Sequence, residues 1–96
     1  MSEDFVDEIG APGNRIEGGT AKAVVEYVAR SIVDTPDAVD VSVKERGAGI
    51  ELLIAADPDD MGRLIGKRGR VIQAVRQVAR AAGAADGVAT SVDVLE

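Results

Sequence analysis

The sequence predicts one α+β domain, in which three helices cover one face of a three-stranded mixed sheet. Strand-like apolar patterns occupy three stretches, residues 39–44, 50–54 and 88–95. Apolar residues recur at helical spacing in three others, residues 21–33, 61–65 and 70–82. A chain of 96 residues is long enough for only one domain, so these six elements are expected to share one small core.

The first segment, residues 1–19, is predicted to be an acidic tail outside the domain. It contains five acidic residues, five glycines or prolines and few large apolar side chains. Such a composition buries too little surface to offset the entropy of ordering. The domain is therefore expected to span residues 20–96. Thr20 is the expected N-cap of the first helix, and Pro36 is expected to end it.

The two following stretches predict a β-hairpin. Residues 39–44 alternate between apolar and polar side chains, as a half-buried strand does. Residues 50–54 are more apolar and are therefore expected to form the central strand. Gly47 and Gly49 mark the turn between them.

The second half of the chain predicts two helices and a last strand. Asp57 is the expected cap and Pro58 the first helical residue, with further carboxylates suited to the positive helix end. The longer helix, residues 70–82, is expected to stop at Gly83. Because two helices separate strands 50–54 and 88–95, these strands are expected to pair in parallel through a right-handed crossover.

Positive charge is concentrated at one place in the sequence. The formal net charge is −6, yet residues 63–80 contain six cations and no acidic residue, which leaves −12 for the rest. An acidic chain that gathers its cations in this way is expected to bind an anion there, most simply a phosphate backbone. The acidic N-terminus and the lack of any long apolar run predict a cytoplasmic protein without a membrane span.

The cations surround a short loop bounded by two glycines. Gly66 and Gly69 bracket Lys67 and Arg68. Glycine permits positive φ and leaves room for close approach, and the helix that begins near Arg70 directs free amides and its positive end toward the loop. A sugar–phosphate strand is therefore expected to lie against residues 66–69.

Aliphatic and basic side chains flank this loop. The aliphatic ones are Ile65, Val71 and Ile72. They are expected to form a floor on which an unpaired base rests. The polar face of the last helix carries Arg70, Gln73, Arg76, Gln77 and Arg80. This stripe either contacts nucleic acid or is a solvated helix face. Arg63 is expected to pair with Asp59 or Asp60 across one helical turn.

The stretch Ile65-Gly66-Lys67-Arg68-Gly69, followed by Ile72, resembles the signature of K-homology (KH) domains, in which aliphatic residues flank Gly-x-x-Gly. The helix-first order is similar to the bacterial type II KH arrangement, α-β-β-α-α-β. Residues 20–96 resemble the KhpA family of small stand-alone RNA-binding proteins. Residues 33–39 and 58–66 are also similar to that family.

The resemblance implies single-stranded RNA as the partner, with Gly66, Lys67, Arg68 and Gly69 clamping the backbone of about four nucleotides. The resemblance also implies a homodimer, or a heterodimer with a companion KhpB-type protein, RNA-chaperone activity, and links to cell elongation and envelope synthesis. Apart from the resemblance, Ile65 and Ile72 of the aliphatic floor and Arg70 and Arg76 of the basic stripe are predicted, from their places beside the loop, to be further RNA-binding residues. The acidic tail is outside the resemblance; from its composition it is expected either to solubilise the protein or to compete with RNA for the basic face.

Other function classes fit the sequence less well. In a P-loop the glycine of the Gly-Lys pair follows the first glycine by five positions, whereas Gly66 follows Gly62 by four, and Arg68 replaces the metal-binding hydroxyl. A calcium loop starting at Asp57 is spoiled by Met61. The chain has neither histidine nor cysteine, so no enzyme, metal site, cofactor or small-molecule substrate is predicted. The alternative that stays open is a protein-interaction module with weak or no RNA binding, suggested by the acidic total charge and small core.

Overall fold

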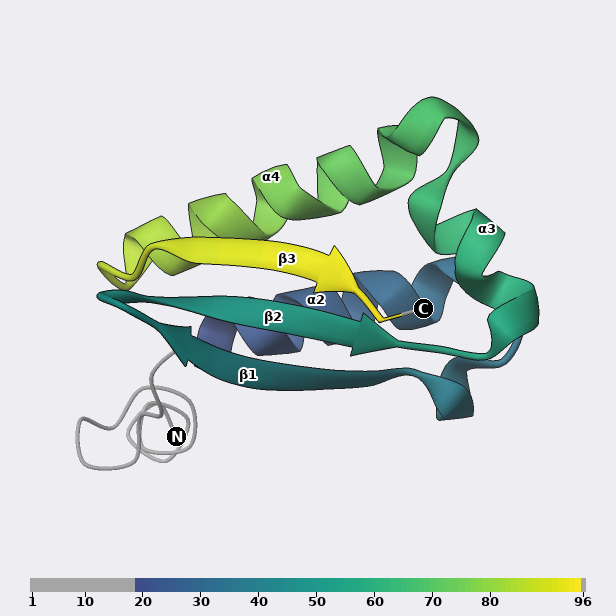
Figure 1. Cartoon of the computed structure of the whole chain (residues 1–96), viewed down its shortest axis with the longest axis horizontal. Helices are drawn as coiled ribbons and strands as arrows, with labels where there is room; N and C mark the ends of the chain where they lie inside the picture. The colour runs from purple at the N-terminus through teal and green to yellow at the C-terminus, as the bar shows by residue number, and fades with distance from the viewer. Residues whose placement is uncertain (1–18, 96) are drawn as a thin grey trace, which may run out of the picture.

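The computed structural model describes residues 19–95, and the six expected elements follow in the expected order (Figure 1). They are helix α2 (Gly19–Ile32), strands β1 (Asp40–Arg46) and β2 (Gly49–Ala55), helices α3 (Met61–Ile65) and α4 (Arg70–Ala85), and strand β3 (Thr90–Val94). Short 3-10 turns occupy Pro36–Ala38, Pro58–Asp60 and Lys67–Gly69. The predicted α+β fold is confirmed. The predicted tail lies outside the described residues, except that Gly19 already belongs to α2.

Helix α2 begins earlier than predicted. Thr20 lies within its first turn, so the expectation that this residue is the N-cap is wrong. A threonine inside a helix lowers helix stability by less than about 0.7 kcal/mol relative to alanine. This penalty is too small to force the helix to begin after Thr20. The face that meets the rest of the domain is formed by Ala21, Val25 and Ala29, which are all buried. Their spacing of four places them in one row along the helix.

The sheet has the order β1-β2-β3, with β2 in the centre as predicted. Strand β1 pairs antiparallel with β2, and β2 pairs parallel with β3. A two-residue turn joins β1 to β2, and its first residue, Gly47, has a φ of +59°. Such turns favour positive φ because their twist matches that of the flanking strands, and glycine adopts it without strain.

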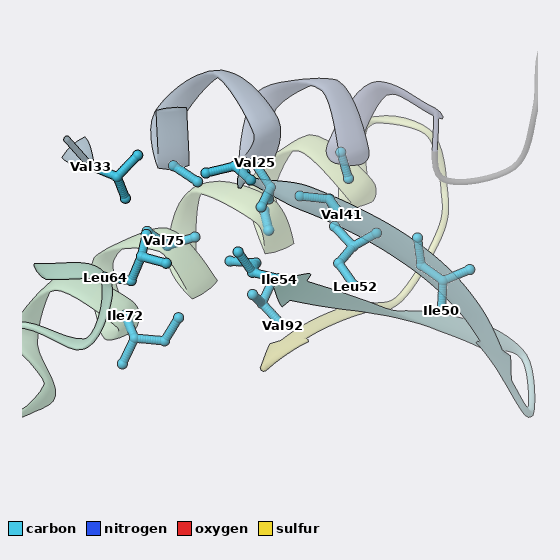
Figure 2. Packing of buried hydrophobic residues seen from close by; sticks show 14 residues of the cluster. Val25, Val33, Val41, Ile50, Leu52, Ile54, Leu64, Ile72, Val75 and Val92 are labelled. Atoms are coloured by element: carbon cyan, nitrogen blue, oxygen red, sulfur yellow. The ribbon is translucent and has the colours of Figure 1, made fainter. Parts of the chain in front are cut away.

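The core lies between the sheet and the helices, which cover one face of the sheet (Figure 2). Strand β2 contributes its alternate residues Ile50, Leu52 and Ile54, each fully buried, while Leu64 comes from α3. Helix α2 packs against β1 and α4, and α4 packs against β3. Burying each large aliphatic side chain stabilises the fold by roughly 1.5–3 kcal/mol, so the central strand is the main source of apolar stabilisation.

Helix α4 does not stop at Gly83 but continues to Ala85, so that prediction is wrong. Gly83 is buried where α4 meets β3: a Cβ built on it would collide with Thr90 Oγ1 and lie 2.7 Å from the Val88 carbonyl oxygen. Glycine is needed here for close packing. The chain turns away just beyond the helix, at Gly87, whose φ is +75°.

The end of α4 is closed by two backbone hydrogen bonds. The amide of Gly87 donates to the Ala84 carbonyl at 3.0 Å, and that of Val88 donates to the Gly83 carbonyl at 2.8 Å. This pair of bonds around a left-handed glycine is the Schellman arrangement, which satisfies carbonyls that the helix leaves free. The chain then turns directly into β3.

The crossover from β2 to β3 places α3, the glycine loop and the start of α4 beyond the carboxyl ends of these strands (Figure 1). Asp57 begins it as predicted: its Oδ1 accepts the amide of Asp59 at 2.9 Å, and Pro58 opens the turn. The glycine loop, residues 66–69, thus lies at the corner between two helices that the core holds in place.

Candidate nucleic-acid interface

The glycine loop is a tight turn with three residues at positive φ. Gly66, Arg68 and Gly69 have φ values of +79°, +58° and +71°. The amide of Gly69 donates to the Gly66 carbonyl at 3.0 Å and closes the turn. Arg68 is the only non-glycine residue with positive φ in residues 19–95, so the turn holds a cationic side chain in a conformation that costs energy.

The two glycines are needed for different reasons. A Cβ on Gly66 would collide with the Val71 side chain and lie 2.7 Å from the Val71 amide nitrogen. A Cβ on Gly69 would meet nothing within 4 Å. Glycine is therefore needed at position 66 for two reasons: the backbone has a positive φ, and the loop passes too close to the start of α4 for a side chain. At position 69 glycine is needed only for the positive φ.

Three cations surround the turn and have no carboxylate partner in the described part of the chain. Lys67, Arg68 and Arg70 are exposed and together line a hollow of about 180 Å³. No carboxylate among residues 19–95 forms an ion pair with them. In a chain of net charge −6, these cations are left available to an anion from outside.

Two other cations of residues 63–80 already have partners within the domain. Arg63 pairs with Asp34 at 3.1 Å and with Asp60 at 3.9 Å; the second pair had been predicted, whereas the first is new. Arg76 donates from Nε to the carbonyl of Val92 at 3.0 Å, and its Nη2 lies 3.7 Å from Asp93. Arg76 therefore lies between α4 and β3 rather than standing free in the predicted stripe.

The predicted aliphatic floor is only partly on the surface. Ile72 is 5% exposed and belongs to the core, whereas Ile65 and Val71 are half-buried at its margin. A base that approaches the loop therefore finds Ile65 and Val71 as the more accessible aliphatic groups. Both pack against the core cluster to which Ile72 belongs.

Two backbone amides of the loop are occupied. Gly69 donates to Gly66, as described, and Arg70 donates to the Lys67 carbonyl. These two groups make internal bonds instead of pointing freely at a ligand. A phosphate at this corner would then be held chiefly by the cationic side chains, with the positive end of α4 behind them.

One residue that positions the loop was not identified from the sequence. Asp60 is 2% exposed, and its two carboxylate oxygens accept the amides of Asp34 at 3.2 Å and Thr35 at 3.0 Å. These bonds tie the start of α3 to the segment after α2. The sequence reading assigned Asp60 to the helix terminus, because its partners lie about 25 residues away and leave no local signal.

Metal-ligand clusters and membrane-spanning helices are both absent from the part of the chain that the structure describes. Nowhere in residues 19–95 do three histidine, cysteine or carboxylate side chains gather as metal ligands would. Over the same range, every helix is too short or too polar to cross a bilayer. The loop itself offers charge and aliphatic contact, which are means of binding a polyanion.

The chain is similar in sequence to several known proteins. A sequence model of the KhpA/KhpB KH domain matches residues 22–94. RNA-binding protein KhpA of Halalkalibacterium halodurans is 37% identical over 75 residues, which cover 78% of this chain and 99% of that protein. The KhpA of Clostridium acetobutylicum is 38% identical over 74 residues, covering 77% and 99%. That of Streptomyces coelicolor is 36% identical over 72 residues, covering 75% and 87%.

A solved structure has a similar fold. Era of Aquifex aeolicus, bound to GDP and AlF4−, superposes on 77% of this chain with a TM-score of 0.57 and 19% sequence identity. The match covers 29% of the Era chain. At this identity the likeness concerns the fold alone.

Proposed function

This chain belongs to the KhpA/KhpB family of KH domains, and we propose that it binds single-stranded RNA at the glycine loop. The observation that carries the proposal is the set of three exposed cations on and beside one tight turn, Lys67, Arg68 and Arg70, without a carboxylate partner in residues 19–95. The relatives are named RNA-binding proteins, which supports the same partner.

In the proposed complex the RNA backbone lies across the turn. Lys67 and Arg68 neutralise phosphates, while Gly66 and Gly69 keep the loop narrow enough for close approach. A KH loop of this kind clamps about four nucleotides. Bases rest on the aliphatic margin at Ile65, which packs against the core cluster to which Ile72 belongs. The site requires no stacking platform, and the domain's one aromatic residue in the described range, Tyr27, lies on α2.

The basic residues of α4 have graded roles in this proposal. Arg70 stands next to the turn and is exposed, so it extends the phosphate contact along the helix. Arg76 is held by Val92 and Asp93, so any contact it makes with RNA competes with bonds inside the domain. We therefore expect Arg76 to contribute less than Arg70 to the electrostatic attraction of RNA.

The proposal has a cellular part, which rests on the family resemblance. One KH unit engages few nucleotides and binds weakly, and pairing two units raises the affinity through effective concentration. Self-association or pairing with a KhpB-type protein is therefore included, as are RNA-chaperone activity, a cytoplasmic location and a role in cell elongation and envelope synthesis. The function proposed is binding without catalysis.

The test is a charge reversal at the turn, read by RNA gel shift and circular dichroism. Lys67→Asp with Arg68→Asp is expected to abolish binding of a single-stranded oligonucleotide while the spectrum stays unchanged. The matched control, Lys22→Asp with Lys44→Asp, makes the same change in net charge on α2 and β1. Equal RNA binding by the folded loop variant and the parent would refute the site. Equal loss in both variants would mean that only net charge matters.

The second candidate function is a protein-interaction module. It is favoured by exposed apolar side chains away from the turn, of which Tyr27 is 75% exposed. Sedimentation combined with RNA titration separates the two functions. Specific association of the protein without RNA binding at any salt concentration would favour the module.

A further inference from the structure

An apolar groove between α2 and α4 is not used by the proposed RNA contact. Its volume is about 270 Å³, and its lining residues are Val28, Ile32, Arg70, Val71, Ala74, Val75 and Val78. Val78 of α4 is 44% exposed. The groove therefore presents aliphatic side chains to water, with one charged residue at its margin.

Arg70 joins this groove to the glycine loop. It lines the groove and also the hollow that Lys67 and Arg68 share. An occupant that is apolar on one side and acidic on the other could therefore fill the groove and place its carboxylates against all three cations. Such an occupant would meet the cations that the RNA backbone needs.

A segment of this chain has this composition. Residues 3–9 read Glu-Asp-Phe-Val-Asp-Glu-Ile and combine four carboxylates with Phe5, Val6 and Ile9. Phe5 is the only phenylalanine of the protein. The rest of the tail up to α2, residues 10–18, contains only one acidic residue, Glu17. The acidic and large apolar groups of the tail are thus concentrated together.

The segment is close enough along the chain to reach the groove. The nine residues 10–18 can bridge up to about 30 Å when extended. Helix α2 has 14 residues, so its start lies about 20 Å from its end at Ile32, which borders the groove. The connection is therefore long enough without displacing any element of the domain.

We propose that residues 3–9 occupy the α2–α4 groove of their own chain, with Phe5 and Ile9 in the groove and the carboxylates facing Arg70 and the loop cations. RNA and the segment then compete for the same charges, which makes the segment an internal regulator of the site. The competition rests on the proposed RNA function, whereas the docking itself does not. Exposed ion pairs of this kind shift affinity by about fivefold or less, and salt weakens them.

The docking is tested by paramagnetic relaxation in the full chain. The protein has no cysteine, so Ser2→Cys gives a single site for a nitroxide. The label is expected to broaden the amide signals of Val28, Ile32 and Val78. Phe5→Ser with Ile9→Ser is expected to remove this broadening, and the matched control Ile16→Ser, outside the acidic cluster, is expected to retain it.

Three outcomes would overturn the docking. They are the absence of broadening at the groove, equal broadening in the Phe5→Ser, Ile9→Ser variant, and broadening that appears only when labelled chains are mixed with separate ¹⁵N chains. The last result would place a second copy, not the chain's own segment, in the groove. High salt is expected to weaken the broadening, because the contact is partly electrostatic.

The competition is tested by titrating the same samples with a single-stranded oligonucleotide. RNA is expected to relieve the broadening, and the Phe5→Ser, Ile9→Ser variant is expected to bind RNA about fivefold more tightly than the parent. Unchanged affinity together with persistent broadening would overturn the competition. If neither protein binds RNA, the proposed function fails, while the relaxation data still decide whether the segment docks.

Discussion

The buried carboxylate of Asp60 accepts the backbone amide of Thr35 at 3.0 Å, across 25 residues of sequence. The amide of Asp34 binds the other oxygen of the same carboxylate at 3.2 Å. One side chain thereby fixes the end of α2 to the start of α3. Since α3 leads directly into the glycine loop, Asp60 determines where the loop stands relative to the core.

The first prediction concerns this tie. Asp60→Ala leaves two amides without their acceptor and is expected to lower the free energy of unfolding by about 2–3 kcal/mol. Asp59→Ala is the matched control, since the Asp59 side chain is exposed and only its backbone amide is bound by Asp57. Urea unfolding measures both. A similar small loss in the two variants would contradict the structural role of Asp60.

The second prediction concerns the unequal glycines of the loop. Gly69→Ala is expected to lower the free energy of unfolding by about 1–2 kcal/mol. Alanine would have to adopt the positive φ of this position, but its methyl group would meet no neighbour. Gly66→Ala is expected to cost more, because its Cβ also collides with Val71. Gly62→Ala in α3 has open space and no positive φ, so it is expected to stabilise by about 0.5–1 kcal/mol. Thermal unfolding gives the order, and equal effects at positions 66 and 69 would refute it.

The third prediction concerns the end of α4. Gly83→Ala would normally favour a helix by about 1 kcal/mol. Here it is expected to destabilise the protein, because Thr90 and the Val88 carbonyl occupy the space that the methyl group needs. Gly87→Asn is expected to be tolerated, since asparagine accepts a left-handed conformation. A rise in melting temperature for Gly83→Ala would show that β3 can move away.

The fourth prediction separates the two arginines of α4 by the salt dependence of RNA binding. With three loop cations in contact, a log–log plot of affinity against salt is expected to have a slope of about −2. Arg70→Gln is expected to make that slope shallower by about 0.7. Arg76→Gln is expected to change the slope less and to lower stability by about 1 kcal/mol, because Val92 and Asp93 lose their partner. Equal slope changes would show that RNA draws Arg76 away from β3.

The features that the sequence predicted well are those with a local physical cause. Alternation and helical spacing located every element, and the run of apolar residues from Ile50 to Ile54 identified the central strand. Asp57 and Pro58 mark a helix start through their own backbone preferences, and they do so here. The positions of Gly66 and Gly69 also follow locally, because a tight turn requires positive φ.

The features that sequence reasoning missed depend on contacts between distant residues. Gly83 looks like a helix stop, and only its closeness to Thr90 shows that it is a packing residue. Arg76 shares a face with Arg80 on a helical wheel, yet it bends onto β3 because Val92 offers a carbonyl there. Asp60 gives no sign of burial until the segment after α2 is placed beside it. Pattern and spacing along one helix contain no information about these partners.

The contact between Arg76 and Val92 also bears on the edge of the sheet that β3 forms. Strand β3 is at the margin of the sheet, and Ala89 and Leu95 bond inward to β2, so Val92 and Val94 direct their backbone groups outward. An open row of such groups is a template on which another chain can add a strand. Arg76 covers the Val92 carbonyl, and the Asp93 carboxylate covers the Val94 amide at 2.8 Å. Two charged side chains thus occupy backbone groups to which an added strand would have to bond, an arrangement that disfavours edge-to-edge pairing at β3.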